Sequence, residues 1–415
     1  MLTHLASKLG KMTPGLLAVA SLSAAAEPLK VAIIEALTGP AEVVGRPLAQ
    51  STRLALDEIN ARGGYNGEPV QIKEYDNAST PTGASEQFRA AVAEGARVIF
   101  QGASSAVAGQ LSDEVRRHNL RNAGKEIILY NVGSEAADLT GAKCHFWFFR
   151  SGTTPEMRWN AVVPVLQAEG VLKSKAFLIN QNYSYGLSVQ NAQRNILKAR
   201  NIEIVGDVLH DLNKVQDFSP YVQNIKSSGA EVVLTGNGFN DMILLVRSIR
   251  DAGLKIGLAA ITLDVPGTLK AAGDAALGYY NVTPFNLSAG PKMDTWVSNF
   301  QKKMGRDPHT YDTTAYNAVM LFGNALTSTS TKGGAVDTKK LALAIESATY
   351  ESPFGVQSMR KEDHQAIMPL FVAKATKAAP KKVDGTDIGF EIVSTIPPAK
   401  AAVPVDAACK MQRPQ

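Results

Sequence analysis

Cysteine and catalytic motifs are both scarce in this chain. Its 415 residues include only two cysteines, and its six histidines do not have the spacing of metal ligands. The sequence also contains no GxSxG, HExxH, Walker A or CxxC motif. We therefore expect no catalytic residues, no metal site and no cofactor, in a protein that is not an enzyme.

An excess of one charge and long apolar runs are lacking as well. Lys and Arg number 43 against 38 Asp and Glu, and no RNP, zinc-finger or helix-turn-helix motif accompanies this mild excess, which argues against nucleic-acid binding. No apolar run reaches the roughly 20 residues that a membrane-spanning helix needs. With 45% hydrophobic and 20% charged residues, the chain has the composition of a soluble globular protein with two or three cores.

The first 26 residues have the pattern of a secretory signal peptide. Lys8 and Lys11 give a positive start, Leu16–Ala20 is an apolar segment, and Ala24–Ala26 supplies the small residues that precede a cleavage site. A disordered N-terminal tail is the alternative. If the segment is a signal, the mature chain begins near Glu27 and is exported.

The two cysteines, Cys144 and Cys409, lie far apart in the sequence. In an oxidising compartment such a pair suggests a disulfide that ties the C-terminal tail to the body of the protein. Two unrelated buried thiols are the alternative. If the bond forms, closing so long a loop stabilises the fold by several kcal/mol, at most about 5 kcal/mol.

Strand and helix patterns alternate from the start of the mature chain. Leu29–Ile34 is an apolar run of strand length. An apolar stripe at helical spacing follows, formed by Leu48, Thr52, Ala55, Leu56 and Ile59. Gly63-Gly64 fits the end of that helix, and Val70 and Ile72 then alternate with polar residues as in a strand. A strand–helix–strand unit of this kind begins a parallel sheet.

The alternation continues along most of the chain. We expect further strands at 96–100, 126–130, 176–179, 202–208, 231–235 and 258–263, and helices at 81–94, 107–115, 160–169, 188–200, 221–227 and 242–249. Beyond Pro291 we expect amphipathic helices at 293–304, 313–327 and 338–348, an exposed loop at 375–386 and an extended tail after Pro397. The predicted fold class is α/β, with two doubly wound lobes whose sheets are mainly parallel.

Ligands of open α/β sheets bind beyond the carboxyl ends of the strands, and small, polar or acidic residues follow five of the predicted strands. The candidate ligand-binding residues in these loops are Ser104, Ser105, Gly133, Ser134, Tyr183, Tyr185, Asn237 and Asp264. Each has an ordinary alternative: the serines could merely cap a helix, Gly133-Ser134 could be a simple turn, a tyrosine could pack on its own lobe, and Asp264 could be a turn residue before Pro266. Gly236–Asp241 half matches a GxGxxG fingerprint, but Asp241 takes the third glycine position, so we expect no dinucleotide site.

Two phrases carry a resemblance to a known family. Leu48–Asn77, with its LA..EIN..GG..G pattern and an acidic residue after the second strand, resembles the start of periplasmic solute-binding proteins of ABC transporters, of the branched-chain amino-acid (Leu/Ile/Val-binding) type. Met359–Gln365, with its R..DHQ run, looks like the return of that family's chain into its second lobe. The resemblance covers nearly all of the mature chain and implies the type I periplasmic binding fold. Its lobes would be residues 28–149 with 284–359 and residues 150–283 with 360–408, joined by a three-stranded hinge, with the ligand in the cleft.

The resemblance also implies a function and roles for the candidate residues. In the family, the serines that match Ser104 and Ser105 bind the ligand carboxylate, and the triplet that matches Gly133 and Ser134 contacts the bound amino acid. Tyr185 matches a ring that covers the ligand, and Asp264 matches an acid that pairs with the ligand ammonium group. Such a protein works in the periplasm, and we expect it to be a monomer. Its partners are a small amino-acid-like ligand and the membrane permease and ATPase of an ABC importer.

Two other functions are compatible with the sequence. The same fold could bind an aromatic or other organic acid, or an amide, and Asp264 would then have no ammonium group to pair with. An α/β hydrolase is the second alternative, and the missing nucleophile and base argue against it.

Overall fold

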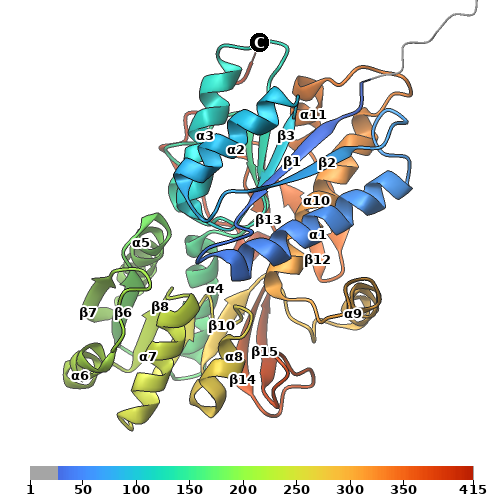
Figure 1. Cartoon of the computed structure of the whole chain (residues 1–415). Helices are drawn as coiled ribbons and strands as arrows, with labels where there is room; N and C mark the ends of the chain where they lie inside the picture. Colours follow the sequence, from blue (N-terminus) through green and yellow to red (C-terminus); the bar gives the residue numbers. More distant parts are fainter. Residues whose placement is uncertain (1–26, 415) are drawn as a thin grey trace, which may run out of the picture.

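The computed structural model describes residues 27–414, and the signal peptide expected at residues 1–26 lies outside them. Two α/β lobes are present, each built around its own sheet, and Figure 1 shows one above the other. The predicted fold class, with two doubly wound lobes, is confirmed. Between residues 27 and 414 no helix is long and apolar enough to cross a membrane.

Lobe 1 is built on a five-stranded parallel sheet with the strand order β2-β1-β3-β4-β5. The strands are β1 (Lys30–Glu35), β2 (Gln71–Asp76), β3 (Val98–Gln101), β4 (Ile128–Asn131) and β5 (Phe148–Arg150). One face packs against α1 (Glu42–Ala61), α10 (Thr310–Thr329) and α11 (Thr338–Ile345), and the other against α2 (Pro81–Ala93) and α3 (Ser105–Asn119). Strand β1 shows why both faces are covered, because Val31 and Ile33 enter one core while Ala32 and Ile34 enter the other.

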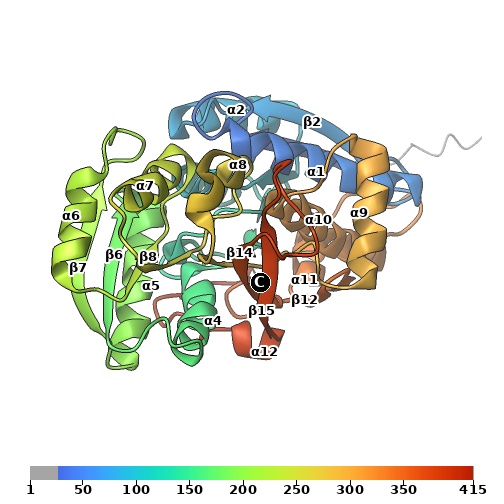
Figure 2. The same cartoon turned by 90° about the horizontal axis from the view of Figure 1, so that it is seen from below.

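Lobe 2 is built on a seven-stranded sheet with the order β15-β14-β10-β9-β8-β6-β7. The parallel strands are β6 (Lys175–Gln181), β7 (Glu203–His210), β8 (Val232–Thr235), β9 (Gly257–Ala260) and β10 (Tyr280–Thr283). Two antiparallel strands extend it, β14 (Leu370–Thr376) and β15 (Gly389–Ile396). Helices α4 (Pro155–Ala168) and α5 (Ser184–Ala199) cover one face, and α6 (Ser219–Ser228), α7 (Phe239–Asp251) and α8 (Thr268–Ala272) cover the other (Figure 2).

The chain passes between the two sheets three times, after β5, after β10 and before β14. The second passage leads through α9 (Pro291–Met304) to α10. The third follows a small antiparallel sheet of β11 (Thr349–Ser352), β12 (Gly355–Met359) and β13 (Ala366–Ile367). Ala366 and Met368 pack in the core of lobe 1, so we propose that the third passage lies after β13. The other expected lobe boundaries stay predictions.

The C-terminal tail forms a fourth link between the lobes. Helix α12 (Pro398–Ala401) buries Ala401 in a core of lobe 2, and the chain then returns to lobe 1. There Cys409 is bonded to Cys144, with their Cα atoms 5.4 Å apart. The Arg413 guanidinium pairs with Glu346 at 2.8 Å, which holds the end of the tail on the same lobe. The disulfide expected from the sequence is therefore confirmed.

Several local expectations differ from the structure. The aromatic residues Phe146–Phe149 overlap β5 (Phe148–Arg150), which was not expected as a strand. Helix α4 begins at Pro155 rather than near residue 160, because Thr154 accepts a hydrogen bond from the Met157 amide (3.1 Å) as its N-cap. Helix α5 begins at Ser184 rather than near residue 188, so Tyr185 lies in its first turn. Strand β14 takes up the start of the expected loop at 375–386, and the tail is helical at α12.

Candidate functional site

Lobe 1 contributes two neighbouring loops, at the carboxyl ends of β3 and β4. Ser104 is the N-cap of α3. The Ser105 hydroxyl accepts a hydrogen bond from the Ala136 amide (3.1 Å), and the Ser134 hydroxyl donates one to the Gly102 carbonyl (2.9 Å). The adjacent parallel strands therefore bring the predicted residues of both loops together.

The N-terminus of α3 is the part of these loops best suited to an anion. The amides of Ser105 and Ala106 lie in its first turn, where no carbonyl of the helix can reach them, and the helix dipole adds positive potential. The amides of Gly133 and Ser134 instead donate to Asn131 Oδ1, at 3.0 and 2.9 Å. A carboxylate would therefore find its donors in the amides of Ser105 and Ala106 and the hydroxyls of Ser104 and Ser105, while Gly133 and Ser134 shape the wall beside them.

Lobe 2 contributes two tyrosines at the start of α5. Tyr183 is the N-cap residue and Tyr185 lies in the first turn, with ring centroids 5.7 Å apart. Gly186 permits this tight start, because a Cβ there would lie 1.8 Å from the Gln181 carbonyl oxygen. Burial raises the pKa of both phenols, so the rings are neutral hydrogen-bonding groups at physiological pH.

A single cleft pocket between the lobes collects most of these residues. Six of the eight predicted residues line it: Ser104, Ser105, Gly133, Ser134, Tyr183 and Tyr185. The rest of the lining was not among the eight candidate residues and consists of Val44, Gly102, Ala103, Glu135, Arg158, Gln181, Gly238, Phe239, Ile261, Thr262, Val265 and Tyr311. The pocket thus combines polar loops of lobe 1 with aromatic and apolar side chains, most of them from lobe 2.

Two of the lining residues of the cleft pocket form a buried ion pair that joins the two lobes. Arg158, on α4, lies 2.9 Å from Oε1 of Glu135, which follows β4. Arg158 also donates through Nε to the Thr153 hydroxyl (2.8 Å) and through Nη1 to the Ile261 carbonyl, and the Thr153 hydroxyl in turn donates to Glu135 Oε1. Burial raises the pKa of Glu135 and Arg158 opposes that rise, whereas the pKa of Arg158 is raised by Glu135 despite its own burial.

Sequence reasoning missed this pair for an identifiable reason. Glu135 directly follows the predicted Ser134, so a charged residue at a strand end was visible. Arg158 was not predicted, because the helix that carries it was expected to begin at residue 160, two residues after Arg158. The Thr154-Pro155 pair is a cap followed by a first-turn proline, and it contained the missing signal.

Asn237 lies beneath the cleft pocket and is not among its lining residues. It is fully buried, its Oδ1 lies 3.0 Å from His210 Nε2, and its carbonyl accepts a hydrogen bond from Thr262. The side chain therefore links β7 to the loop after β8, and the backbone carbonyl holds Thr262 in the wall of the pocket. Its predicted contact with a ligand stays a prediction.

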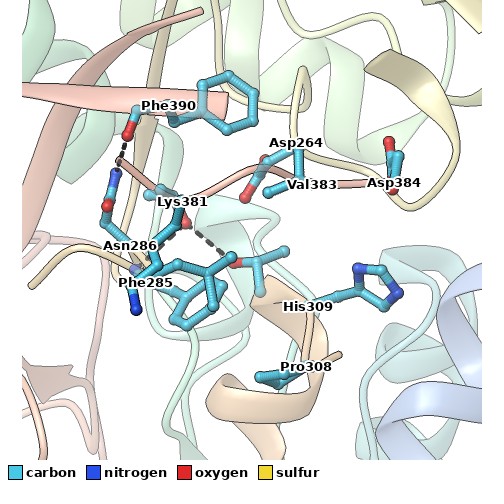
Figure 3. A pocket seen from close by; sticks show the side chains of 12 residues that line it. Asp264, Phe285, Asn286, Pro308, His309, Lys381, Val383, Asp384 and Phe390 are labelled. Atoms are coloured by element: carbon cyan, nitrogen blue, oxygen red, sulfur yellow. Dashed lines mark hydrogen bonds between the residues drawn. The ribbon is translucent and has the colours of Figure 1, made fainter. Parts of the chain in front are cut away.

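Asp264 lines a second, adjacent cavity rather than the cleft pocket. Figure 3 shows its carboxyl group there, with Phe285, His309, Lys381 and Phe390 around the same space. Its Oδ2 is buried without a hydrogen-bond partner among the described residues, and burial raises its pKa although Arg158 opposes the change. The resemblance assigns this acid to the ligand ammonium group, and that role stays a prediction.

Glu35 lies under the anion-binding loop. This residue ends β1, is 1% exposed, and its Oε2 accepts a hydrogen bond from the Ala103 amide at 3.2 Å. Burial raises the pKa of Glu35 to about 8, although the amides of Ala103, Ala36 and Gly102 act to lower it. The carboxyl group is therefore mostly protonated at neutral pH, and the loop that faces an incoming carboxylate carries no negative charge beneath it.

The buried Glu35 makes folding stability depend on pH. Between pH 5 and pH 8 the folded state holds a proton that the unfolded state releases, so stability falls as pH rises through this window. Replacing Glu35 with glutamine removes this dependence. For a single proton, the free energy of unfolding changes by at most about 1.4 kcal/mol per pH unit. Between pH 5 and pH 8 the wild type should therefore lose about 3–4 kcal/mol of unfolding free energy relative to Glu35→Gln, measured by urea unfolding. The exposed Glu86→Gln variant is the control, and parallel pH profiles for wild type and Glu35→Gln would contradict the prediction.

The fold and the cleft between lobes define a solute-binding protein, and sequence comparison agrees. A sequence profile of the periplasmic binding protein family matches residues 28–380, so this chain belongs to that family. It is 42% identical over 392 residues to Leu/Ile/Val-binding protein homolog 4 of Brucella abortus (strain 2308), an alignment that covers 94% of each protein.

Solved structures agree with this assignment. The leucine-, isoleucine-, valine-, threonine-, and alanine-binding protein of Brucella ovis, crystallised in a closed conformation, is 42% identical. It superposes with a TM-score of 0.90, covering 94% of this chain and 100% of that one. A solute-binding protein of an ABC transporter from R. palustris, in complex with benzoate, shares the fold at a TM-score of 0.76 with 19% identity, covering 92% of this chain and 100% of that one.

Proposed function

We propose that this chain is the periplasmic substrate-binding component of an ABC importer and that it binds a small amino acid, branched-chain or related, by hinge closure. The cleft pocket carries the proposal, because it places the N-terminus of α3 with Ser104 and Ser105 opposite Tyr183 and Tyr185 of the other lobe. Both lobes must then contribute to binding, as hinge closure requires. The names of the 42% identical relatives support an amino acid as the ligand.

The proposed partners follow from this role. A periplasmic protein that closes on its ligand would deliver it to the permease and ATPase of an ABC importer, and we propose that it does so as a monomer. Catalysis is not part of the proposal. Among the described residues, the lining of the cleft pocket contains no histidine, cysteine or lysine that could activate a serine. Mass spectrometry of ligands recovered after incubation tests this point, since chemical turnover would contradict it.

Direct binding tests the proposed function. A thermal-shift screen of the common L-amino acids should raise the melting temperature for a small set, because a ligand at one hundred times its Kd stabilises the folded state by about 2.7 kcal/mol. The screen should include benzoate and related aromatic acids, since tyrosine and phenylalanine rings line the pocket and the benzoate-binding relative has the same fold. Stabilisation by aromatic acids alone would replace the amino-acid proposal, and no shift from any solute would overturn both.

Ser104→Ala tests the anion site by a separate route. Removing a hydroxyl that donates to a carboxylate costs about 1.5–3 kcal/mol, so we expect the Kd to rise about 10- to 100-fold by calorimetry. Stability should change less, because the Ser104 cap bond to the Val107 amide is long, at 3.5 Å. Ser347→Ala, at an exposed position just after α11 that does not line the cleft pocket, is the matched control. An unchanged Kd for Ser104→Ala would remove the serine loop from the binding site.

A further inference from the structure

The charges of the cleft pocket are few and balanced. Of the eighteen residues that line it, Glu135 is the one acid and Arg158 the one base. Both side chains are only 10% exposed, and the pair joins the two lobes. A ligand that enters this space therefore meets one carboxylate and one guanidinium, and their hydrogen bonds decide which of them is available.

The hydrogen bonds leave Glu135 better placed than Arg158 to bind a ligand. Nε and Nη1 of Arg158 donate to the Thr153 hydroxyl and the Ile261 carbonyl, and Nη2 lies 2.9 Å from Glu135 Oε1 in the ion pair. Both partners of Glu135, Arg158 and Thr153, use the same oxygen, Oε1. Within the described part of the chain, Oε2 accepts no hydrogen bond, and it is not among the buried atoms that lack a partner. Arg158 thus orients a carboxylate whose second oxygen is free on the side of the pocket.

Glu135 is also at the right place relative to the anion site. It follows Ser134 directly, and the next amide, that of Ala136, donates to the Ser105 hydroxyl at 3.1 Å. The acid and the N-terminus of α3 are therefore joined through one hydrogen bond. In an α-amino acid a single carbon separates the ammonium and carboxylate groups, so their binding groups on the protein must be close neighbours.

We propose that Glu135 is the counter-ion of the ligand ammonium group and that Arg158 positions it, so that the pocket selects α-amino acids over simple carboxylic acids. This inference rests on the proposed function and names the ligand class of the same site. It gives Glu135 the role that the sequence resemblance assigned to Asp264. The ligand carboxylate binds at Ser104 and Ser105, and its ammonium group donates to Glu135 Oε2.

Isothermal titration calorimetry with a matched ligand pair tests the proposal. The amino acid that binds the wild type most tightly in the screen is compared with its des-amino carboxylic acid, which is 4-methylpentanoate if the amino acid is L-leucine. We expect the des-amino acid to bind the wild type at least 30-fold more weakly. Equal affinities of the two ligands would overturn the proposal, and this measurement needs no variant.

Two substitutions separate the competing acids. Glu135→Gln should raise the Kd of the amino acid at least 30-fold and leave that of the des-amino acid within about threefold, whereas Asp264→Asn tests the alternative assignment. Loss of affinity in Asp264→Asn with none in Glu135→Gln would overturn the proposal. Circular dichroism and melting temperature confirm that each variant is folded, with Glu86→Gln as control. A wild type that binds no amino acid overturns the proposed function as well, whereas amino-acid binding unaffected by Glu135→Gln overturns this inference alone.

Discussion

Replacing Arg158 with methionine should lower the free energy of unfolding by about 3–5 kcal/mol, the usual cost of breaking a buried ion pair. The substitution leaves the carboxylate of Glu135 buried without its counter-charge and takes a donor from the Ile261 carbonyl. The loss should be smaller at pH 5 than at pH 8, because a protonated Glu135 needs no counter-charge. Urea unfolding followed by tryptophan fluorescence measures it, since Trp159 is buried next to the substituted residue.

Two further variants show whether the ion pair is the cause. Arg158→Met combined with Glu135→Gln should recover part of the loss, because the double variant no longer buries an unpaired charge. Arg194→Met breaks an ion pair with Asp207 in which the arginine side chain is 47% exposed, and it should cost less than about 1 kcal/mol. Equal losses from Arg158→Met and Arg194→Met would mean that the buried Glu135–Arg158 pair stabilises the fold no more than an exposed ion pair does.

Removing the Cys144–Cys409 disulfide should lower the free energy of unfolding by about 2–5 kcal/mol, because the bond closes a very long loop. The sequence separation is 265 residues, so the unfolded chain gains a large amount of conformational freedom when the bond is absent. The Cys144→Ser/Cys409→Ser double variant, compared with the oxidised wild type in guanidinium unfolding, measures the effect.

The contacts of the tail supply the control for the disulfide. Arg413→Ala removes the ion pair with Glu346, in which the arginine is 36% exposed, and should cost less than about 1 kcal/mol. If the tail were held mainly by such contacts, Arg413→Ala would cost as much as the double serine variant. A double serine variant as stable as the wild type would show that the loop closure does not limit unfolding.

Periodicity predicted the parts of this fold whose side chains repeat a pattern. The stripe from Leu48 to Ile59 is buried in α1, and the apolar run at Leu29–Ile34 is β1 with one residue's shift. Strand β5 was not predicted, because it has three residues and its aromatic run repeats no pattern that distinguishes a strand from a packed loop. Short elements of this kind are stabilised by their neighbours in the sheet, which the sequence does not reveal.

The candidate site was predictable where strand ends supply it and not where distant elements meet. Ser104, Ser134 and Tyr185 follow or flank strands, so the rule for open sheets located them. Arg158 reaches the cleft from a helix, and Tyr311 reaches it from the first turn of α10. Their positions depend on how the lobes pack, and the same packing places Asp264 in the adjacent cavity.

The return of the tail to lobe 1 has a practical consequence for the design of a fluorescent sensor of lobe closure. Both ends of the described chain belong to that lobe, since β1 begins near the N-terminus and Cys409 is bonded to Cys144 (Figure 1). Fluorescent proteins fused to the two termini would therefore move together as a rigid unit, and the energy transfer between them would change little on ligand binding. A sensor built from this chain needs one fluorophore in lobe 2, for example at the exposed turn around Gly229 between α6 and β8.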